Sequence, residues 1–310
     1  MPRIAVTSPS FAAHPTLRAE LEQLFPDVTY NETGRTPTDA APLLSGMDAA
    51  IVGRERIDGA VLDRCPTVRM ISKYGVGLDN VDEPALAQRG VALGWTGGVN
   101  RRSVSELALC AMLGLLRHVV QSSNHLRAGT WRKEGGRELS GSVVGIVGLG
   151  FVGTDLARLL APFGCTILVN DLRDVSADCA AHGWIDATKD RLWAESDVVS
   201  LHVPLTPDTR HLVNAAVLER MRSDAYLINT SRGAVVDEQA LLAALRSGGI
   251  AGAALDVFAV EPPTDRALLD LENVLATPHI GGASREAMLA MGRSAIHHLA
   301  QFFGLREHSA

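Results

Sequence analysis

The stretch VVGIVGLGFVG, which is Val143–Gly153, is an apolar run followed by three glycines in the spacing GxGxxG. A strand, a tight turn and a helix in this order form a common binding element for a dinucleotide. Gly148 permits the tight turn, Gly150 lets the backbone approach a pyrophosphate, and Gly153 lets the helix pack closely on the strand. We expect the helix to begin at Thr154 and to offer its N-terminal N–H groups to phosphates.

An acidic residue, Asp171, closely follows the next apolar run, Thr166–Val169. A carboxylate here accepts hydrogen bonds from the ribose hydroxyls of an adenosine and repels a 2′-phosphate, so the pattern favours NAD over NADP. Arg173 acts in the opposite direction, because a guanidinium can pair with the extra phosphate. The alternative is an ordinary βα turn with Asp171 capping a loop. It is disfavoured because strand, helix and acid stand in register.

The size and charge of the chain limit the classes of protein to consider. At 310 residues it exceeds the length at which one core stops growing, which predicts two domains. Hydrophobic residues make up 46% and charged residues 21%, a globular balance that argues against disorder. The net charge of -6 gives no reason to expect a nucleic acid partner.

The cysteines, the N-terminal run and the most apolar window indicate where in the cell the protein is located. Four cysteines without CxxC spacing predict reduced thiols in a cytoplasm. The N-terminal run Arg3–Ser8 lacks the features of a signal peptide. The most apolar window, Leu107–Leu116, is shorter than the ~20 residues that span a bilayer. We therefore expect a cytoplasmic protein with no membrane partner.

Short apolar runs alternate with helical patterns along the chain, which predicts parallel sheets flanked by helices. Gly94–Asn100 interrupts the pattern with three glycines and is the expected domain crossing. A long helix should follow, with Ser103 and Ser105 capping its start and apolar residues continuing to Val120. The last helical stretch, Arg285–Phe303, is amphipathic and can pack on either domain. The expected strands are Arg3–Ser8, Ala49–Gly53, Val68–Lys73, Val91–Gly94, Val143–Gly148, Thr166–Val169, Asp197–Leu201, Ala225–Asn229, Ile250–Leu255 and Val274–Ala276.

Three polar residues, Arg232, Glu261 and His279, follow the last three of these strands. The carboxyl ends of parallel strands meet at one edge of a sheet, where open α/β sheets bind ligands. Hydride transfer to or from an alcohol carbon needs a group that exchanges a proton near neutrality. Histidine does so at an unperturbed pKa of ~6.5, and a neighbouring carboxylate fixes its ring. An arginine grips a carboxylate through two contacts.

Each of these residues also has a structural explanation: a strand-end histidine, a glutamate in a turn, an arginine on a loop. Three at successive strand ends after a nucleotide turn favour an active site. A serine hydrolase has no support because the chain has no GxSxG motif. A metal site is not expected, because the adjacent His297 and His298 would point to different faces of a helix.

The chain resembles the D-isomer-specific 2-hydroxyacid dehydrogenases over nearly its whole length, through the segments KYGVGLDNVD, SVSELAL, GIVGLGFVG, LHVPLTPDTRHLVN, LINTSRGAVVDEQAL, ALDVFAVEPP and ATPHIGGAS. The resemblance implies that Arg232, Glu261 and His279 are catalytic, that Asp171 holds the ribose and that Asp256 holds the nicotinamide amide. The other cofactor-binding residues that it implies are Gly148, Gly150, Phe151, Val152, Gly153, His202, Val203, Pro204, Thr209, Thr230, Ser231, Gly281 and Gly282. The substrate-binding residues that we expect are Arg54, Lys73, Tyr74, Gly75, Val76, Gly77 and Asn100.

The resemblance also implies an α/β architecture of two doubly wound parallel-sheet domains. A flavodoxin-like substrate domain covers 1–98 and is completed by 284–310, and a Rossmann NAD-binding domain, 99–283, is inserted into it. The final helix then returns to the N-terminal half. The long apolar helix that follows the crossing is expected to form the surface of a homodimer.

Some positions depart from the family pattern. Phe151-Val152 stands where many relatives have arginine and isoleucine, which removes a possible phosphate contact. Lys73 stands where arginine is common. Glu261 replaces the glutamine of the formate dehydrogenases, which argues against formate. The chain ends soon after Phe303, so we expect no appended regulatory domain.

The expected activity is the NAD(H)-dependent interconversion of a D-2-hydroxy acid and its 2-keto acid. Arg54, Arg56, Arg101 and Arg102 favour a phosphate- or phosphonate-bearing substrate resembling 3-phosphoglycerate. Two alternatives stay open: a hydroxypyruvate or glyoxylate reductase, and a binding protein of a different class, an NADH-sensing corepressor.

Overall fold

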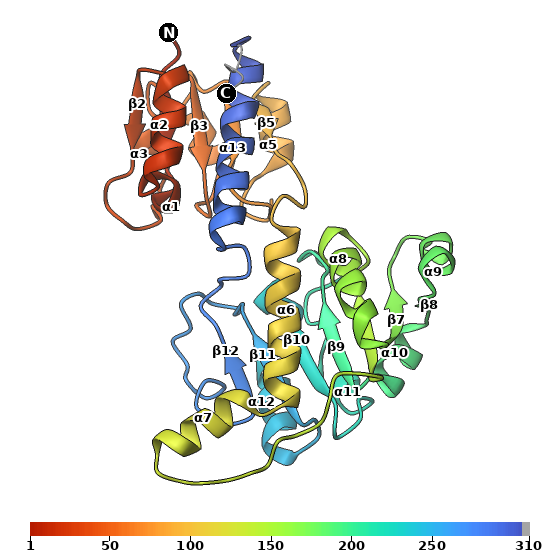
Figure 1. Ribbon diagram of the computed structural model, residues 1–310. Coiled ribbons are helices and arrows are strands. Elements are labelled where there is room, and N and C mark those ends of the chain that lie inside the picture. Colours follow the sequence, from red (N-terminus) through yellow and green to blue (C-terminus); the bar gives the residue numbers. More distant parts are fainter. Residues whose placement is uncertain (306–310) are drawn as a thin grey trace. The chain divides into compact units, whose positions relative to one another are not determined.

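The computed structural model describes residues 1–305, which form two compact units (Figure 1). Unit 1 comprises Met1–Asn100 together with the segment that begins at Ser284. Unit 2 comprises Arg101–Ala283. The chain thus leaves unit 1 two residues after the crossing at 98/99 that the sequence suggests, and returns to it at the expected 283/284.

Unit 1 is a five-stranded parallel sheet in the order β2-β1-β3-β4-β5. This is the flavodoxin-like order, so the predicted fold class is confirmed here. Helices α1, α2 and α13 cover one face of the sheet, and α3, α4 and α5 cover the other. A hydrophobic core lies beneath each set of helices. The strands are β1 (Ile4–Val6), β2 (Val28–Tyr30), β3 (Ala49–Val52), β4 (Met70–Lys73) and β5 (Ala92–Gly94). The helices are α1 (Pro9–Ala12), α2 (Pro15–Leu24), α3 (Ala41–Leu44), α4 (Gly59–Asp63), α5 (Glu83–Gln88) and α13 (Arg285–Phe302).

Helix α13 packs on unit 1, a choice that its amphipathic pattern left open. Ser72 of β4 donates to the carbonyl of Ala295 at 2.8 Å. A Cβ on Gly292 would lie 2.3 Å from a methyl group of Leu17, so α13 and α2 are in close contact. A larger side chain at Gly292 would push these helices apart.

Unit 2 is a seven-stranded parallel sheet in the order β12-β11-β10-β9-β6-β7-β8, the doubly wound arrangement that the glycine turn predicts. Helices α6, α8 and α9 cover one face and α10, α11 and α12 the other. The strands are β6 (Val143–Val147), β7 (Thr166–Asn170), β8 (Ile185–Asp186), β9 (Val198–Leu201), β10 (Tyr226–Asn229), β11 (Gly252–Leu255) and β12 (Val274–Ala276). The helices are α6 (Arg101–Leu116), α7 (Val119–Arg127), α8 (Phe151–Leu160), η1 (Ala161–Phe163), α9 (Ser176–His182), α10 (Lys189–Glu195), α11 (Ala215–Leu218), η2 (Gly233–Val235) and α12 (Glu238–Ser247).

The long helix after the crossing differs from the expectation at both ends. It begins at Arg101, so Ser103 and Ser105 lie inside α6 and the capping prediction is wrong. Their hydroxyls donate to the carbonyls of Gly281 and Arg102 instead. At the other end His118 adopts a left-handed conformation with φ 51°, which separates α6 from α7.

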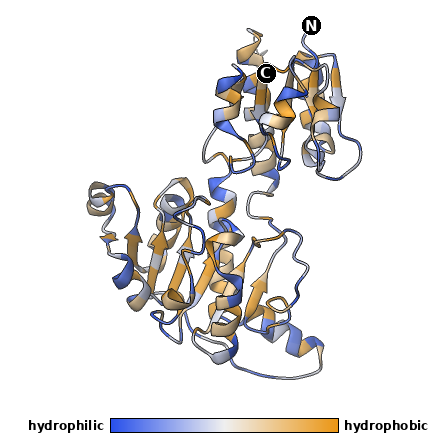
Figure 2. Ribbon diagram, turned by 180° about the vertical axis from the view of Figure 1, so that it is seen from behind, coloured by the Kyte–Doolittle hydropathy of each residue, from blue (hydrophilic) through white to orange (hydrophobic). Residues whose placement is uncertain are grey.

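The apolar side chains concentrate in the strands of both units, as the hydropathy colouring in Figure 2 shows. Within residues 1–305 no single helix is long and apolar enough to cross a membrane. Helices α6 and α7 pass that test only together, as a pair bent by 59°.

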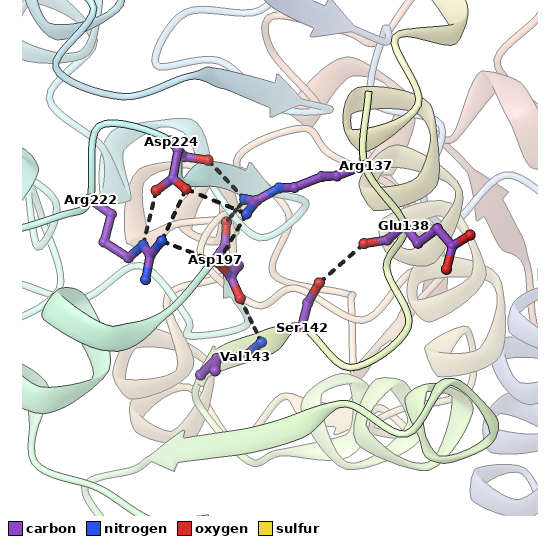
Figure 3. Close-up of polar contacts among 7 residues, drawn as sticks. All are labelled: Arg137, Glu138, Ser142, Val143, Asp197, Arg222 and Asp224. Carbon is purple, nitrogen blue, oxygen red and sulfur yellow. Dashed lines mark hydrogen bonds and ion pairs between the residues drawn. The ribbon is translucent and has the colours of Figure 1, made fainter. Parts of the chain in front are cut away.

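An ion-pair network closes unit 2 at the amino-terminal edge of its sheet (Figure 3). Asp197, just before β9, accepts from the backbone N–H of Val143 at 2.8 Å and from Arg137 at 3.0 Å. Arg137 also donates to the carbonyl of Asp224, whose carboxylate binds Arg222 through two contacts. The Arg222 guanidinium lowers the pKa of Asp224. This network holds the starts of β6, β9 and β10 together. The opposite edge of the sheet, where the strands end, is the edge at which open parallel sheets bind ligands.

Candidate active site

The candidate catalytic residues follow three neighbouring strands of unit 2, namely β10, β11 and β12. Arg232 lies three residues after β10, Glu261 six residues after β11, and His279 three residues after β12. Because these strands are parallel and adjacent, the loops that leave them meet at one edge of the sheet.

His279 and Glu261 form a direct pair, with Nδ1 of the imidazole 2.7 Å from Oε2 of the carboxylate. An ionised carboxylate can only accept, so Nδ1 carries the hydrogen and Nε2 is the nitrogen left to exchange a proton. The other oxygen of Glu261 accepts from the backbone N–H of Phe258 at 3.2 Å, which fixes the carboxylate. The side chains of His279 and Glu261 are 31% and 23% exposed, so both groups remain accessible from one side.

His279 has a left-handed backbone with φ 55°, a conformation that non-glycine residues adopt at a cost of about 1–3 kcal/mol. Asp256, which is 3% exposed, holds the turn in place. Its two oxygens accept from the backbone N–H groups of Ile280 and Gly281 at 2.8 Å each. Oδ1 also accepts from the hydroxyl of Thr277 at 2.6 Å. Asp256 therefore positions the histidine turn, a role that sequence reasoning did not assign to it.

Arg232 is held by a buried asparagine that sequence reasoning missed. Asn229, the last residue of β10, donates to the carbonyl of Arg232 at 2.9 Å and accepts from Ser231. A Cβ on Gly233 would lie 1.9 Å from the carbonyl carbon of Phe258, so the arginine loop packs directly on the loop that leads to Glu261. An asparagine at the end of a buried strand, two residues before a serine, was the available signal.

The glycine turn has the geometry that its spacing predicts. Gly148 has φ 95°, and a Cβ there would lie 2.6 Å from the carbonyl oxygen of His202. A Cβ on Gly153 would lie 2.0 Å from the carbonyl oxygen of Gly148, which permits close packing of helix on strand. Gly150 has no atom within 4 Å of that position, so its backbone is open to a ligand. Helix α8 begins at Phe151, three residues before the predicted start.

Asp171 binds back to the glycine turn. Its Oδ2 accepts from the N–H of Leu149 at 2.7 Å, and its Oδ1 accepts from the N–H of Arg173 at 2.9 Å. The guanidinium of Arg173 donates to the carbonyl of Leu149 at 2.8 Å. Asp171, the acid expected at the ribose, is therefore bonded to the glycine turn, and Arg173 contacts the same turn.

The segment after β9 supplies the remaining expected contacts. The N–H of His202 donates to Val147 at 2.8 Å, beside the glycine turn, and its Nε2 lies 2.8 Å from the hydroxyl of Ser200. Burial lowers the pKa of His202 to about 4, so the ring is neutral at physiological pH. Thr209 donates to the carbonyl of Pro204 at 2.6 Å and closes the loop that directly follows Val203.

Two observations indicate that a dinucleotide fits this edge of the sheet. Gly150 leaves the turn open at the N-terminus of α8, where a phosphate is stabilised by free N–H groups. The hydroxyl of Thr230 is buried and has no hydrogen-bond partner among residues 1–305. A buried polar atom of this kind calls for a bound group. In the same part of the chain, no group of three or more histidine, cysteine or acidic residues is arranged to hold a metal ion.

The expected substrate residues all belong to unit 1. Lys73 is 5% exposed, and its ammonium donates to the carbonyl of Gly53 and to Oδ1 of Asn80, so it fixes the turn that it begins. Tyr74 is buried edge-on against Phe11, with ring centroids 5.4 Å apart. The other residues are Gly75, with φ 130°, the half-buried Val76, Gly77 and Asn100, and the exposed Arg54.

Residues 109–281 match the family model described as the NAD-binding domain of D-isomer-specific 2-hydroxyacid dehydrogenases. The chain is 36% identical over 256 residues to a hydroxypyruvate reductase of Thermotoga maritima, covering 81% of this chain and 83% of the relative. It is 39% identical over 287 residues to a glyoxylate reductase of Thermofilum pendens, covering 88% and 84%.

A solved structure extends the likeness to the whole fold. The D-lactate dehydrogenase of Aquifex aeolicus, crystallised with NAD and lactic acid, superimposes with a TM-score of 0.84 at 25% identity, covering 97% of this chain and 95% of the other. Matches of this identity and coverage establish the family and the nucleotide-binding role of unit 2. The chain belongs to the D-isomer-specific 2-hydroxyacid dehydrogenases and is an oxidoreductase with an NAD-binding domain.

Proposed function

We propose that this enzyme reduces a small 2-keto acid with NADH, either glyoxylate to the achiral glycolate or hydroxypyruvate to D-glycerate. The observation that carries the proposal is the His279–Glu261 pair, 2.7 Å apart, on loops that leave the same sheet edge as Arg232. The relatives named as hydroxypyruvate and glyoxylate reductases support this choice of substrate.

In the sequence, four arginines favoured a phosphorylated substrate. Their contacts in the folded chain give that choice less support. Arg56 binds Asp58 at 2.7 Å, and Arg102 binds the nearly buried carboxylate of Asp155 at 3.0 Å. These partners neutralise charges that a phosphate would need. Because two of the four arginines are paired with carboxylates, the case for a phosphorylated substrate is weaker.

NADH supplies the hydride. Arg232 orients the substrate by gripping its carboxylate and polarising its carbonyl. His279 delivers a proton from Nε2 to the carbonyl oxygen, so that one hydride and one proton convert the ketone to the alcohol. Glu261 holds the opposite ring nitrogen and stabilises the charged imidazole before transfer. Within unit 1, the turn Lys73–Gly77 offers backbone N–H groups that suit a carboxylate.

We assign NAD as the preferred cofactor because Asp171 lies at the glycine turn, where a ribose hydroxyl would bind and a 2′-phosphate would be repelled. Arg173, which could favour NADP, is directed to the carbonyl of Leu149. Replacing Asp171 with serine should raise the ratio of kcat/KM with NADPH to that with NADH by about 10-fold, equivalent to 1.4 kcal/mol.

The test is a spectrophotometric screen of NADH and NADPH oxidation with glyoxylate, hydroxypyruvate, pyruvate and phosphorylated or phosphonylated 2-keto acids. We expect NADH with one of the two small acids to give the highest kcat/KM, and hydroxypyruvate to give the D enantiomer of glycerate. Preference for a phosphorylated acid would contradict the choice of substrate. Tight NADH binding without turnover on any acid would favour an NADH-sensing binding protein.

We also propose a cytoplasmic homodimer that pairs through α6 and α7. The outward face of α6 is apolar at Leu109 and Leu113 and lines a hollow that reaches Val119. Val119, Val120 and Leu126, all on α7, are 54%, 44% and 58% exposed, and apolar residues that gather in this way mark an interaction surface. The four cysteines are unpaired thiols, which suits a reducing compartment.

Sedimentation velocity tests the dimer. We expect a dimer for the wild type and a monomer for Leu126→Glu. The control is Leu172→Glu, which changes an 86% exposed leucine in the loop after β7 and should leave the dimer intact. A wild-type monomer would refute the proposal.

A further inference from the structure

Trp95 makes a contact that the proposed mechanism does not use. It directly follows β5, and its indole Nε1 donates to the carbonyl of Val76 at 2.9 Å. Val76 lies in the turn Lys73–Gly77, which follows β4, and β4 and β5 are paired neighbours in the sheet of unit 1. The indole is 38% exposed, so it is not simply a core side chain.

The hydrogen bond fixes the direction of one peptide group. The carbonyl of Val76 and the N–H of Gly77 belong to the same planar trans peptide and point in opposite directions. When the carbonyl is bound to Trp95, the N–H of Gly77 points away from Trp95. Glycines on both sides of Val76 would otherwise let this peptide rotate at little cost. The bond also polarises the peptide, which makes its N–H a stronger donor.

Trp95 is itself attached to α13 through its neighbours. The hydroxyl of Thr96 lies 2.8 Å from Nε2 of His298 and accepts from Ser294 at 2.9 Å. Burial lowers the pKa of His298, which favours the neutral ring in this contact. A Cβ on Gly94 would lie 2.5 Å from the Cβ of His298, so the end of β5 is pressed against the helix.

The turn is therefore held at two points. Lys73 fixes its start through Gly53 and Asn80, and Trp95 fixes the peptide after Val76. Only the second point controls the direction of an N–H group within the turn. Packing alone would not require an indole nitrogen at this place.

We propose that Trp95 is a positioning residue for the substrate carboxylate: by holding the carbonyl of Val76, it presents the N–H of Gly77 to the 2-keto acid. The proposal rests on the assignment of Lys73–Gly77 as the carboxylate turn. Trp95 acts through the backbone and does not touch the reacting atoms.

The variant Trp95→Phe keeps an aromatic ring and removes the N–H. We expect the KM for the keto acid to rise by about 3- to 10-fold, the effect of one lost hydrogen bond. The kcat, the KM for NADH and the melting temperature should stay close to wild type. The Kd of oxamate, an unreactive carboxylate analogue, measured by calorimetry on the NADH-saturated enzyme, should rise by the same factor. Trp131→Phe, at a 74% exposed tryptophan of unit 2, is the matched control.

Two results would overturn the inference. One is an oxamate Kd for Trp95→Phe within a factor of about two of wild type, well below the expected loss. The other is a parallel decline in oxamate binding, NADH binding and melting temperature, which would mean that Trp95 only supports the fold. Because oxamate binding is measured without turnover, wild-type enzyme that binds oxamate but reduces no keto acid would refute the proposed function and still decide the role of Trp95.

Discussion

The Nδ1 atom of His279 lies 2.7 Å from Oε2 of Glu261, although the histidine is held in a left-handed backbone conformation. The pair joins two loops that leave the adjacent strands β11 and β12. Its geometry depends on the turn around His279 as much as on the two side chains. Mutations of the pair should therefore lower kcat, whereas mutations of the turn should lower both kcat and the free energy of unfolding.

Replacing His279 with alanine removes the proton donor. We expect kcat to fall by about 10²- to 10⁴-fold, the range for loss of general acid–base catalysis, with the Kd for NADH nearly unchanged. Stopped-flow turnover and NADH fluorescence titration measure the two quantities. Glu261→Gln should lower kcat less, because an amide oxygen can still accept from Nδ1. Activity retained by His279→Ala would refute the assignment.

Replacing Asp256 with asparagine should disturb the histidine turn. An amide presents one acceptor oxygen where the carboxylate presents two, so one of the N–H groups of Ile280 and Gly281 loses its partner. We expect a loss of about 1–3 kcal/mol in unfolding free energy together with a lower kcat. Urea unfolding and turnover measure these effects. Asp270→Asn, at an exposed ion pair with Arg266, is the control and should change neither.

Two glycines of the nucleotide turn should respond differently to alanine. At Gly150 nothing lies within 4 Å of the added methyl group, so stability should be nearly unchanged while NADH binding weakens by about 10-fold or more, equivalent to 1.4 kcal/mol. At Gly148 the positive φ and the carbonyl of His202 leave no room, so the protein should lose stability as well. Thermal melts with and without NADH separate the two. Equal melting temperatures for both variants would contradict this account.

Acid should destabilise the protein through His202. Its pKa is lowered to about 4 in the folded chain, below the ~6.5 of an unfolded histidine. The unfolded state therefore binds more protons, and the stabilising contribution is present above pH ~6.5 and is lost as pH falls toward about 4. The lowered pKa of His298 acts in the same direction. Melting temperatures across this range should fall less steeply for His202→Gln than for the wild type, and parallel slopes would argue against the prediction.

Local patterns predicted the main features of the fold and the candidate site. The spacing of Gly148, Gly150 and Gly153 depends on steric limits within one turn, so it can be recognised without distant contacts. The runs that became β10 to β12 placed Arg232, Glu261 and His279 at one edge because parallel strands end together.

Other features depended on contacts between distant segments. The break at His118 and the start of α6 at Arg101 did not follow from the apolar pattern, which continues across both helices. The packing of α13 on unit 1 was also left open by its amphipathic face, which fits either domain. Helical periodicity indicates that one face of a helix is buried. It does not indicate which domain covers that face.

The sequence by itself determined the two parallel sheets, the nucleotide turn and the order of the candidate catalytic residues. Contacts between segments far apart in the chain decided what holds them: Asp256 binds the turn around His279, Lys73 binds Gly53, and Trp95 binds Val76. The physical reason is that a glycine spacing or a strand is encoded by neighbouring residues. A buried hydrogen bond forms between groups that only the folded chain brings together, over separations of up to 25 residues in these cases.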